Sequence, residues 1–223
     1  MDANLAYFAG LAYGDGYPEY GEVRIVTSNE LFKDKVLVVA NAIAKSNRAT
    51  VRVYVRPSGI SDKPQITVSL NSTAIRRILF DEEMKPRYDT MLAIAVDTEL
   101  APHFQAGLTD AEGTLLLPEP INSPHGRVFA VGNSDKRLLG IARLSLLRTL
   151  RLEPTSVRIR LYSRKGRQHT VRGVTITTKK NNYILEILSG SKFKWLAQVG
   201  RNLRHPEKAE KAGILLSTFQ NSP

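Results

Sequence analysis

The chain has 223 residues, a formal net charge of +11, 42% hydrophobic residues and no cysteine. A chain of this length and composition can bury a core, so a disordered tail is excluded, and the lack of Cys excludes disulfides, thiol nucleophiles and zinc ribbons. No apolar run is long enough to span a membrane and no signal peptide is recognisable, so we expect a soluble protein of the cytoplasm.

The first 80 residues have a hydrophobic pattern that predicts the order α-β-β-α-β-β-α. The expected elements are a low-charge helix over 4–14, a short strand or turn over 17–21, a strand over 22–27, a helix from Ser28 or Asn29 to Asn47, strands over 51–56 and 65–70, and a helix from Asn71 or Ser72 to Phe80. Alternation places Val23 and Ile25 inward and Arg24 outward, and the helix that follows carries the apolar residues Leu31, Phe32, Val36, Val39, Ala40 and Ile43.

Residues 81–100 are predicted to be a linker with a short helix, because they are acidic at both ends and apolar in the middle. The chain is thus divided into a first half over 1–80, this linker, and a second half over 101–223. The second half repeats the order of the first: a strand over 114–117, a hairpin tip over 118–126, a strand over 127–132, a helix over 135–150, a strand over 157–164, an additional basic hairpin over 165–178, a strand over 183–188 and a helix capped by Ser189 or Ser191.

The end of the second half carries the remaining expectations. The last predicted helix carries Phe193, Trp195, Leu196 and Val199, and Phe193, Trp195 and Phe80 are assigned to the core. The tail from His205 is charged or polar, so we expect it to be partly loose.

The positive charge is concentrated in residues 151–180, which hold nine Lys or Arg and one acid. This concentration favours a nucleic-acid surface. The alternative is a generally basic protein whose charges are only solvated. It is less favoured because these charges alternate with apolar residues on predicted strands.

A nine-residue motif opens each half. Residues 8–16 read FAGLAYGDG and residues 105–113 read QAGLTDAEG, so both contain Ala-Gly-Leu, a small residue, an acid and a glycine. The small residues predict two helices packed backbone against backbone, each ending at the acid and a helix-stopping glycine. If the two copies face each other, Asp15 and Glu112 meet at one end, and two carboxylates forced together are best explained by a divalent cation between them.

With these two motif copies, the chain resembles the LAGLIDADG homing endonucleases of the single-chain, two-repeat, archaeal intron-encoded type. Phe8 and Gln105 replace the opening Leu, Ala12 and Thr109 replace Ile, and Tyr13 replaces the first Asp, but no departure touches the metal-binding acid. The resemblance implies an α+β fold with two pseudo-symmetric αββαββα halves. Each half would have a saddle-shaped antiparallel sheet that lies in the DNA major groove, and the halves would be joined at the motif helices.

The resemblance also implies an activity. The chain would be a monomeric, metal-dependent endonuclease that hydrolyses phosphodiester bonds and makes a double-strand break at a specific DNA site. Asp15 and Glu112, with backbone carbonyls near Gly14 and Ala111, would bind Mg²⁺, and Mn²⁺ or Ca²⁺ would substitute for binding. Protein-splicing signals are not recognisable, which favours an intron-encoded protein.

Two further groups of polar residues are candidates by the same resemblance. Arg76 and Lys194 begin the last helix of each half, where the family often has a lysine that polarises water or phosphate; Lys192 competes with Lys194. Contact with backbone phosphate or solvent is the alternative for both. Polar residues at the strand-to-helix junctions would order water, although plain N-capping is the favoured interpretation; these are Ser28, Asn29, Asn133 and Ser134.

Arg and Tyr alternate on strand faces in both halves, which predicts contacts with bases and phosphates. The candidates are Arg24, Arg52, Tyr54, Arg56, Arg127, Arg158, Arg160, Tyr162, Arg164, Lys165, Arg167, Arg172, Lys179 and Lys180. A solvated strand face is the alternative for each. Direct alignment places Phe129, not Arg127, where Arg24 sits, so the outward face of 127–132 stays open.

Two other functions remain possible on the same fold. One is an RNA maturase or another protein that binds intron RNA, and the other is a non-catalytic DNA-binding regulator. Both motif copies keep the acid and its glycine, which favours cleavage of DNA.

Overall fold

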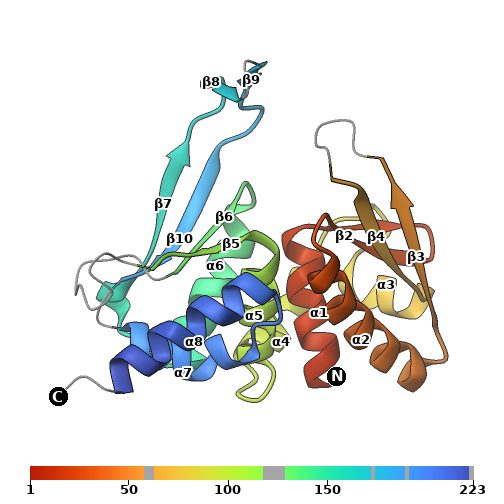
Figure 1. The fold of residues 1–223 in the computed structure, drawn as a ribbon, viewed down its shortest axis with the longest axis horizontal. Helices are drawn as coiled ribbons and strands as arrows, with labels where there is room; N and C mark the ends of the chain where they lie inside the picture. Colours follow the sequence, from red (N-terminus) through yellow and green to blue (C-terminus); the bar gives the residue numbers. More distant parts are fainter. Residues whose placement is uncertain (58–62, 118–128, 172–173, 189–190, 221–223) are drawn as a thin grey trace.

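The computed structural model describes residues 1–57, 63–117, 129–171, 174–188 and 191–220. Over these residues the chain is mixed α+β, with eight α-helices, two four-stranded antiparallel sheets and a separate two-stranded hairpin. The predicted α+β class and its two antiparallel sheets are therefore confirmed. Figure 1 shows the sheets on either side of a central pair of helices, α1 (Ala3–Gly14) and α5 (Ala101–Glu112).

The first sheet has the strand order β1 (Gly16–Glu19), β2 (Glu22–Thr27), β4 (Gln65–Asn71) and β3 (Thr50–Arg56), with helices α2 (Glu30–Asn47) and α3 (Thr73–Leu79). Val23 and Ile25 are buried, as predicted. The side chains of Asn29 and Ser72 cap the two helices by accepting hydrogen bonds from backbone N–H groups three residues ahead.

Leu31, the first of the apolar residues on the predicted helix, is 64% exposed. The buried stripe of α2 runs through Phe32, Val36, Val39 and Ile43 at helical spacing. Leu31 lies one residue off that stripe, which turns its side chain by about 100° toward solvent.

The second sheet has the order β5 (Gly113–Leu115), β6 (Phe129–Asn133), β10 (Asn182–Ile187) and β7 (Val157–Ser163). Both sheets therefore place the first, second, fourth and third strands of the motif repeat side by side. The predicted additional hairpin is formed by β8 (Gln168–Val171) and β9 (Val174–Thr177). The predicted hairpin tip over 118–126 and the residues Arg127, Arg172 and Ser189 lie outside the described residues.

The predicted helix over 135–150 consists of α6 (Lys136–Leu144) followed by a π-helical turn (Ser145–Thr149). The Asp135 side chain caps it by accepting from the N–H groups of Arg137 and Leu138, so neither Asn133 nor Ser134 is the cap. Short 3₁₀ turns cover Pro154–Ser156 and Gly200–Asn202.

The linker contains helix α4 (Tyr88–Val96), which is packed into the molecule. Met91, Ile94 and Ala95 are buried, and the helix contacts α5 and α6. The Thr149 hydroxyl donates a hydrogen bond to the Ala95 carbonyl (2.9 Å). The apolar middle of the linker is therefore part of the core, and the linker also joins the two sheets.

The tail from His205, expected to be partly loose, is helical from Pro206 to Gln220. After α7 (Lys192–Gln198), the chain forms α8 (Pro206–Gln220), which buries Ala212 and Leu215 against α7 and β5. Phe193 was assigned to the core but is 47% exposed, whereas Trp195 is fully buried and stacks on Phe129. Across the described helices, none is both long and apolar enough to cross a bilayer.

Candidate functional site

The two motif helices cross with their backbones in contact. A Cβ atom on Gly10 would lie 2.2 Å from the carbonyl oxygen of Phe104, and one on Gly107 would lie 2.0 Å from that of Tyr7. Real Cβ atoms do not approach backbone oxygens so closely, so these positions accept only glycine. The crossing therefore has the close packing that the small residues of the motif predict.

Asp15 and Glu112 lie at the same end of this crossing. Asp15 is the C-cap of α1, and Glu112 is the last residue of α5. A Cβ on Gly14 would lie 3.1 Å from the Cγ of Glu112, so the last turns of the helices touch. Burial, and secondly the charge of Asp15, raises the pKa of Glu112 to about 7. Burial also raises the pKa of Asp15.

Each motif helix ends at its acid and the following glycine, as predicted, but that glycine does not have the left-handed conformation of the usual helix stop. Gly113 has φ −86°, and the described glycines with positive φ are Gly21 and Gly166. A Cβ on Gly16 would lie 2.6 Å from the Cα of Ala12. These glycines are needed because the following strand folds back closely over the last helical turn.

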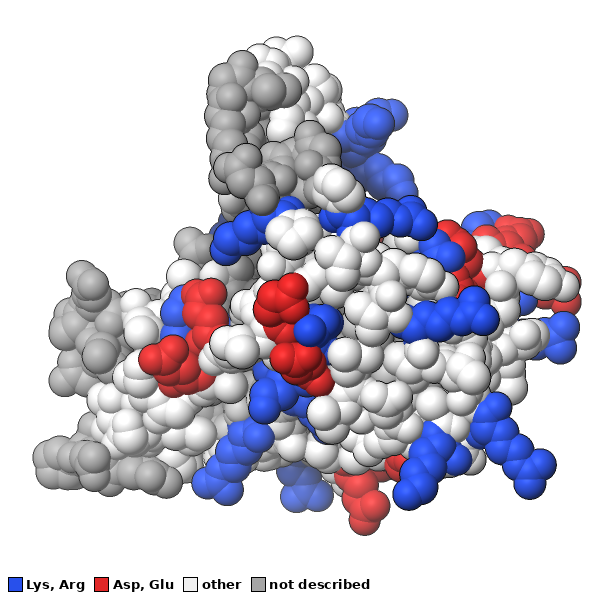
Figure 2. All heavy atoms as spheres, turned by 45° about the vertical axis from the view of Figure 1, so that its right-hand side comes forward, with Lys and Arg blue, Asp and Glu red and all other residues white. Residues whose placement is uncertain are grey.

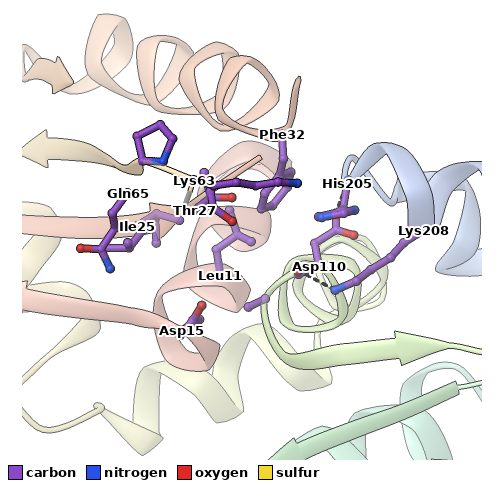
Figure 3. A pocket seen from close by; sticks show the side chains of 14 residues that line it. Leu11, Asp15, Ile25, Thr27, Phe32, Lys63, Gln65, Asp110, His205 and Lys208 are labelled. Carbon is purple, nitrogen blue, oxygen red and sulfur yellow. Dashed lines mark hydrogen bonds between the residues drawn. The ribbon is translucent and has the colours of Figure 1, made fainter. Parts of the chain in front are cut away.

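Each acid lines a pocket against one sheet. The Asp15 pocket encloses about 380 Å³ and is also lined by β2, the start of β4, the end of α5 and residues of the α8 segment (Figure 3). The Glu112 pocket encloses about 480 Å³ against β6 and β10. Gly16 pairs with Ile25 and Gly113 with Val131.

This register gives Thr27 and Asn133 the same place in their sheets, each two residues beyond the partner of the motif glycine. Thr27 lines the Asp15 pocket and Asn133 lines the Glu112 pocket. The Asn133 side-chain amide donates to a Glu112 carboxylate oxygen at 3.4 Å. Asn133 thus lies beside the acid rather than capping a helix.

The two acids fit a magnesium ion better than a metal that needs many protein ligands. No group of three or more His, Cys, Asp or Glu side chains gathers as a metal cage in the described part of the chain. Mg²⁺ usually takes one or two carboxylates and completes its shell with water and substrate phosphate. The carboxylates of Asp15 and Glu112, with nearby backbone carbonyls, match that requirement.

Lys208 of α8 is a site residue that the sequence did not indicate. Its ammonium group donates to the carbonyl oxygens of Thr109 and Asp110, at 2.8 Å each. Its positive charge opposes the raised pKa values of both Asp15 and Glu112. Figure 3 shows Lys208 reaching from α8 to the end of α5. Because the segment was expected to be loose, nothing in the sequence placed it here.

Asp110 holds the start of α8 in place. One of its carboxylate oxygens accepts from the Tyr7 hydroxyl (2.5 Å) and from the backbone N–H groups of Arg204 (2.7 Å) and His205 (3.1 Å). Asp110 occupies the place of the first Asp of the motif. It therefore links α1, α5 and the segment that carries Lys208.

The predicted basic site residues lie elsewhere. Arg76 is 6% exposed and donates to the Asp81 carbonyl at 2.8 Å. Lys194 is exposed and donates to the Arg151 carbonyl at 2.7 Å. Lys192 is buried, which lowers its pKa. The structure brings none of the three into a described contact with the motif acids.

Nine of the predicted DNA contacts are exposed on strands or on the adjoining basic hairpin: Arg52, Arg56, Arg158, Tyr162, Arg164, Lys165, Arg167, Lys179 and Lys180. Tyr54 is half-buried and lies on the same face of β3 as Arg52 and Arg56. On the face drawn in Figure 2, Lys and Arg spread over the upper part and the lower edge, with small groups of acids among them. Charge by itself therefore does not mark a single patch on that face.

Three predicted arginines, including the exposed Arg158, are paired with buried carboxylates. Arg24 contacts Glu22, which is 7% exposed. Arg158 and Arg160 each donate through Nε to Glu186, at 3.0 Å, and Glu186 is fully buried. Ala130 pairs with Glu186 as Arg24 pairs with Ser69, so Ala130, not Phe129 or Arg127, holds the place of Arg24.

A scan of the chain against protein-family models finds no match, and a search of curated proteins finds none either.

Replacing Glu112 with Gln is expected to stabilise the cation-free protein at pH 8 but not at pH 4. Folding raises the pKa of this carboxyl from 4.5 to about 7, so between these values the unfolded chain ionises first and stability falls as pH rises. Allowing for partial solvent screening, the gain at pH 8 is about 1–2 kcal/mol. Thermal unfolding in EDTA measures it, with the exposed Glu99→Gln as control. An equal gain at both pH values would contradict the burial of Glu112.

Proposed function

We propose that the chain is a site-specific double-strand DNA endonuclease of the LAGLIDADG homing type, built from two pseudo-symmetric αββαββα halves. The observation that carries the proposal is the meeting of Asp15 and Glu112 at one end of the α1–α5 crossing. Each acid faces a sheet, and the two sheets share one strand order. A single chain therefore offers two carboxylate sites, one for each DNA strand.

In this proposal, separate groups of residues bind the duplex, hold the metal ion and hydrogen-bond water. Exposed arginines, lysines and tyrosines of the sheets bind the duplex through phosphates and base edges. Asp15 and Glu112 would hold Mg²⁺ with carbonyls near Gly14 and Ala111. The ion supplies stabilisation of charge on the phosphodiester oxygens. The Thr27 hydroxyl and the Asn133 amide line the two pockets and would hydrogen-bond water there.

The test needs no knowledge of the target. The purified chain is incubated with a library of randomised duplexes in Mg²⁺, and newly made ends are captured by adaptor ligation and sequenced. We expect one related group of sequences, cut in both strands, and no cutting in EDTA. Duplex binding should weaken steeply as salt rises, because several phosphates are neutralised.

The rival functions are outcomes of the same experiment. Selective duplex binding without cutting in either Mg²⁺ or Mn²⁺ would contradict the proposal and favour a DNA-binding regulator. Selective binding to folded RNA, with no selected duplex, would favour a maturase.

A further inference from the structure

The ammonium group of Lys208 has one N–H donor for which no acceptor is described. An ammonium group has three N–H donors. Two of them serve the carbonyls of Thr109 and Asp110 at the end of α5. Among the described contacts of Lys208, no third acceptor takes the remaining donor. The charge is thus fixed at the end of the crossing with one donor available for a ligand.

Two residues that line the pocket of Asp15 and Lys208 each have a buried side-chain atom without a described hydrogen-bond partner (Figure 3). These atoms are Oδ1 of Asp110, a residue that is 3% exposed, and Nδ1 of His205. Buried polar atoms in native proteins are nearly always hydrogen-bonded to protein or water. A pocket lined by Asp15, Lys63, His205 and Lys208 suits a hydrated, charged ligand rather than an apolar one.

The two motif pockets differ in charge although they are similar in size. Lys63, His205 and Lys208 line the Asp15 pocket. The described lining of the Glu112 pocket contains no Lys, Arg or His, and Asn133 is the side-chain donor to its acid. Two of these three residues come from the end of the chain, because Lys208 lies on α8 and His205 directly precedes it, whereas Lys63 lies ahead of β4.

We propose that Lys208 contacts the phosphate that is cut in the Asp15 pocket, so that the two DNA strands meet chemically unequal sites. The inference rests on the proposed endonuclease function and adds a residue outside both motif repeats. Asp110 is the positioning residue, because its carboxylate anchors the N–H groups of Arg204 and His205 just before α8. Burial lowers the pKa of Lys208, and a bound phosphate would favour its charged form.

Strand-resolved cleavage tests the proposal. The substrate is the duplex recovered by the library selection, labelled on each strand in turn and cut under single-turnover conditions. Lys208→Met should slow one strand by about 10²-fold, the usual loss when a donor to the transition state is removed. Asn133→Ala should slow the opposite strand. Lys211→Met is the matched control, because Lys211 lies on the same helix and pairs with Glu207.

A second readout does not depend on metal. In EDTA, the slope of duplex affinity against salt should fall by about one for Lys208→Met and stay unchanged for Lys211→Met. If Met at position 208 unfolds the chain, Lys208→Gln replaces it, since Gln still donates to the two carbonyls.

The outcomes separate this inference from the function on which it rests. Equal slowing of both strands, or an unchanged salt slope with unchanged rates, would overturn the role of Lys208 while the endonuclease proposal stands. A wild-type chain that cuts no duplex would instead overturn the proposed function.

Discussion

Replacing Asp15 with Asn is expected to lower the rate of double-strand cleavage at least about 10³-fold, while affinity for the duplex stays within about threefold. A bound metal supplies several kcal/mol of transition-state stabilisation, and each 1.36 kcal/mol is a tenfold change in rate. Asn keeps the shape of the side chain but loses the charge that holds the cation. Quantitative cleavage assays and binding in Ca²⁺ measure the two effects separately.

The matched control for this prediction is Asp34→Asn. Asp34 is an exposed carboxylate on α2 that pairs with Lys33, and its replacement changes the net charge by the same amount. It should cut at the wild-type rate. If Asp15→Asn lost binding and cutting in equal measure, Asp15 would be supporting the DNA contact or the fold rather than the chemistry.

Replacing Gly107 with Ala is expected to destabilise the protein by at least about 3 kcal/mol, or to prevent folding. The added Cβ would lie 2.0 Å from the Tyr7 carbonyl oxygen and 3.1 Å from the Leu11 nitrogen. Backbone atoms cannot move aside by changing rotamer, so α1 and α5 must separate and open the core between them. Urea or thermal unfolding followed by circular dichroism measures the loss.

The same substitution at Gly140 should have the opposite sign. Gly140 lies within α6, and a Cβ there would meet nothing within 4 Å. Ala is preferred to Gly in a helix by about 1 kcal/mol, so Gly140→Ala should stabilise the protein slightly. Equal effects at Gly107 and Gly140 would mean that the helices do not cross as closely as the structure has them.

Features that depend on a local pattern of residues could be predicted from the sequence. Period-two alternation located strands such as β2 and β3, and the caps of α2 and α3 were among the residues named. The duplicated motif predicted the helix crossing, because small residues at helical spacing have few other uses. The π-helical turn after α6 has no comparable signal in the sequence.

Features set by distant contacts could not be predicted. Lys208 reaches the motif because Asp110 anchors residues more than 90 positions away, and no local pattern records that contact. The charged composition of the tail also led to the expectation of a partly loose segment. Charged residues lie on the outer face of α8, whereas the apolar stripe that includes Ala212 and Leu215 is buried. Lys194, chosen by its place at a helix start, lies instead against the Arg151 carbonyl.

The pairing of arginines with buried glutamates is a further case. Glu186 is the one charged residue of β10, yet it is fully buried and accepts hydrogen bonds from Arg158 and Arg160. Burial of an acid depends on which strand lies beside it, and β10 meets β7 only in the folded sheet.

The packing of α4 has a practical consequence for hybrid proteins. Although α4 precedes the second motif, its apolar side contacts α5 and α6, and the Thr149 hydroxyl reaches its last turn. A chimera whose seam falls between α4 and α5 would give this helix a foreign neighbour. A seam placed ahead of Tyr88 would transfer α4 together with α5 and α6, and that version is the one to build when halves are exchanged.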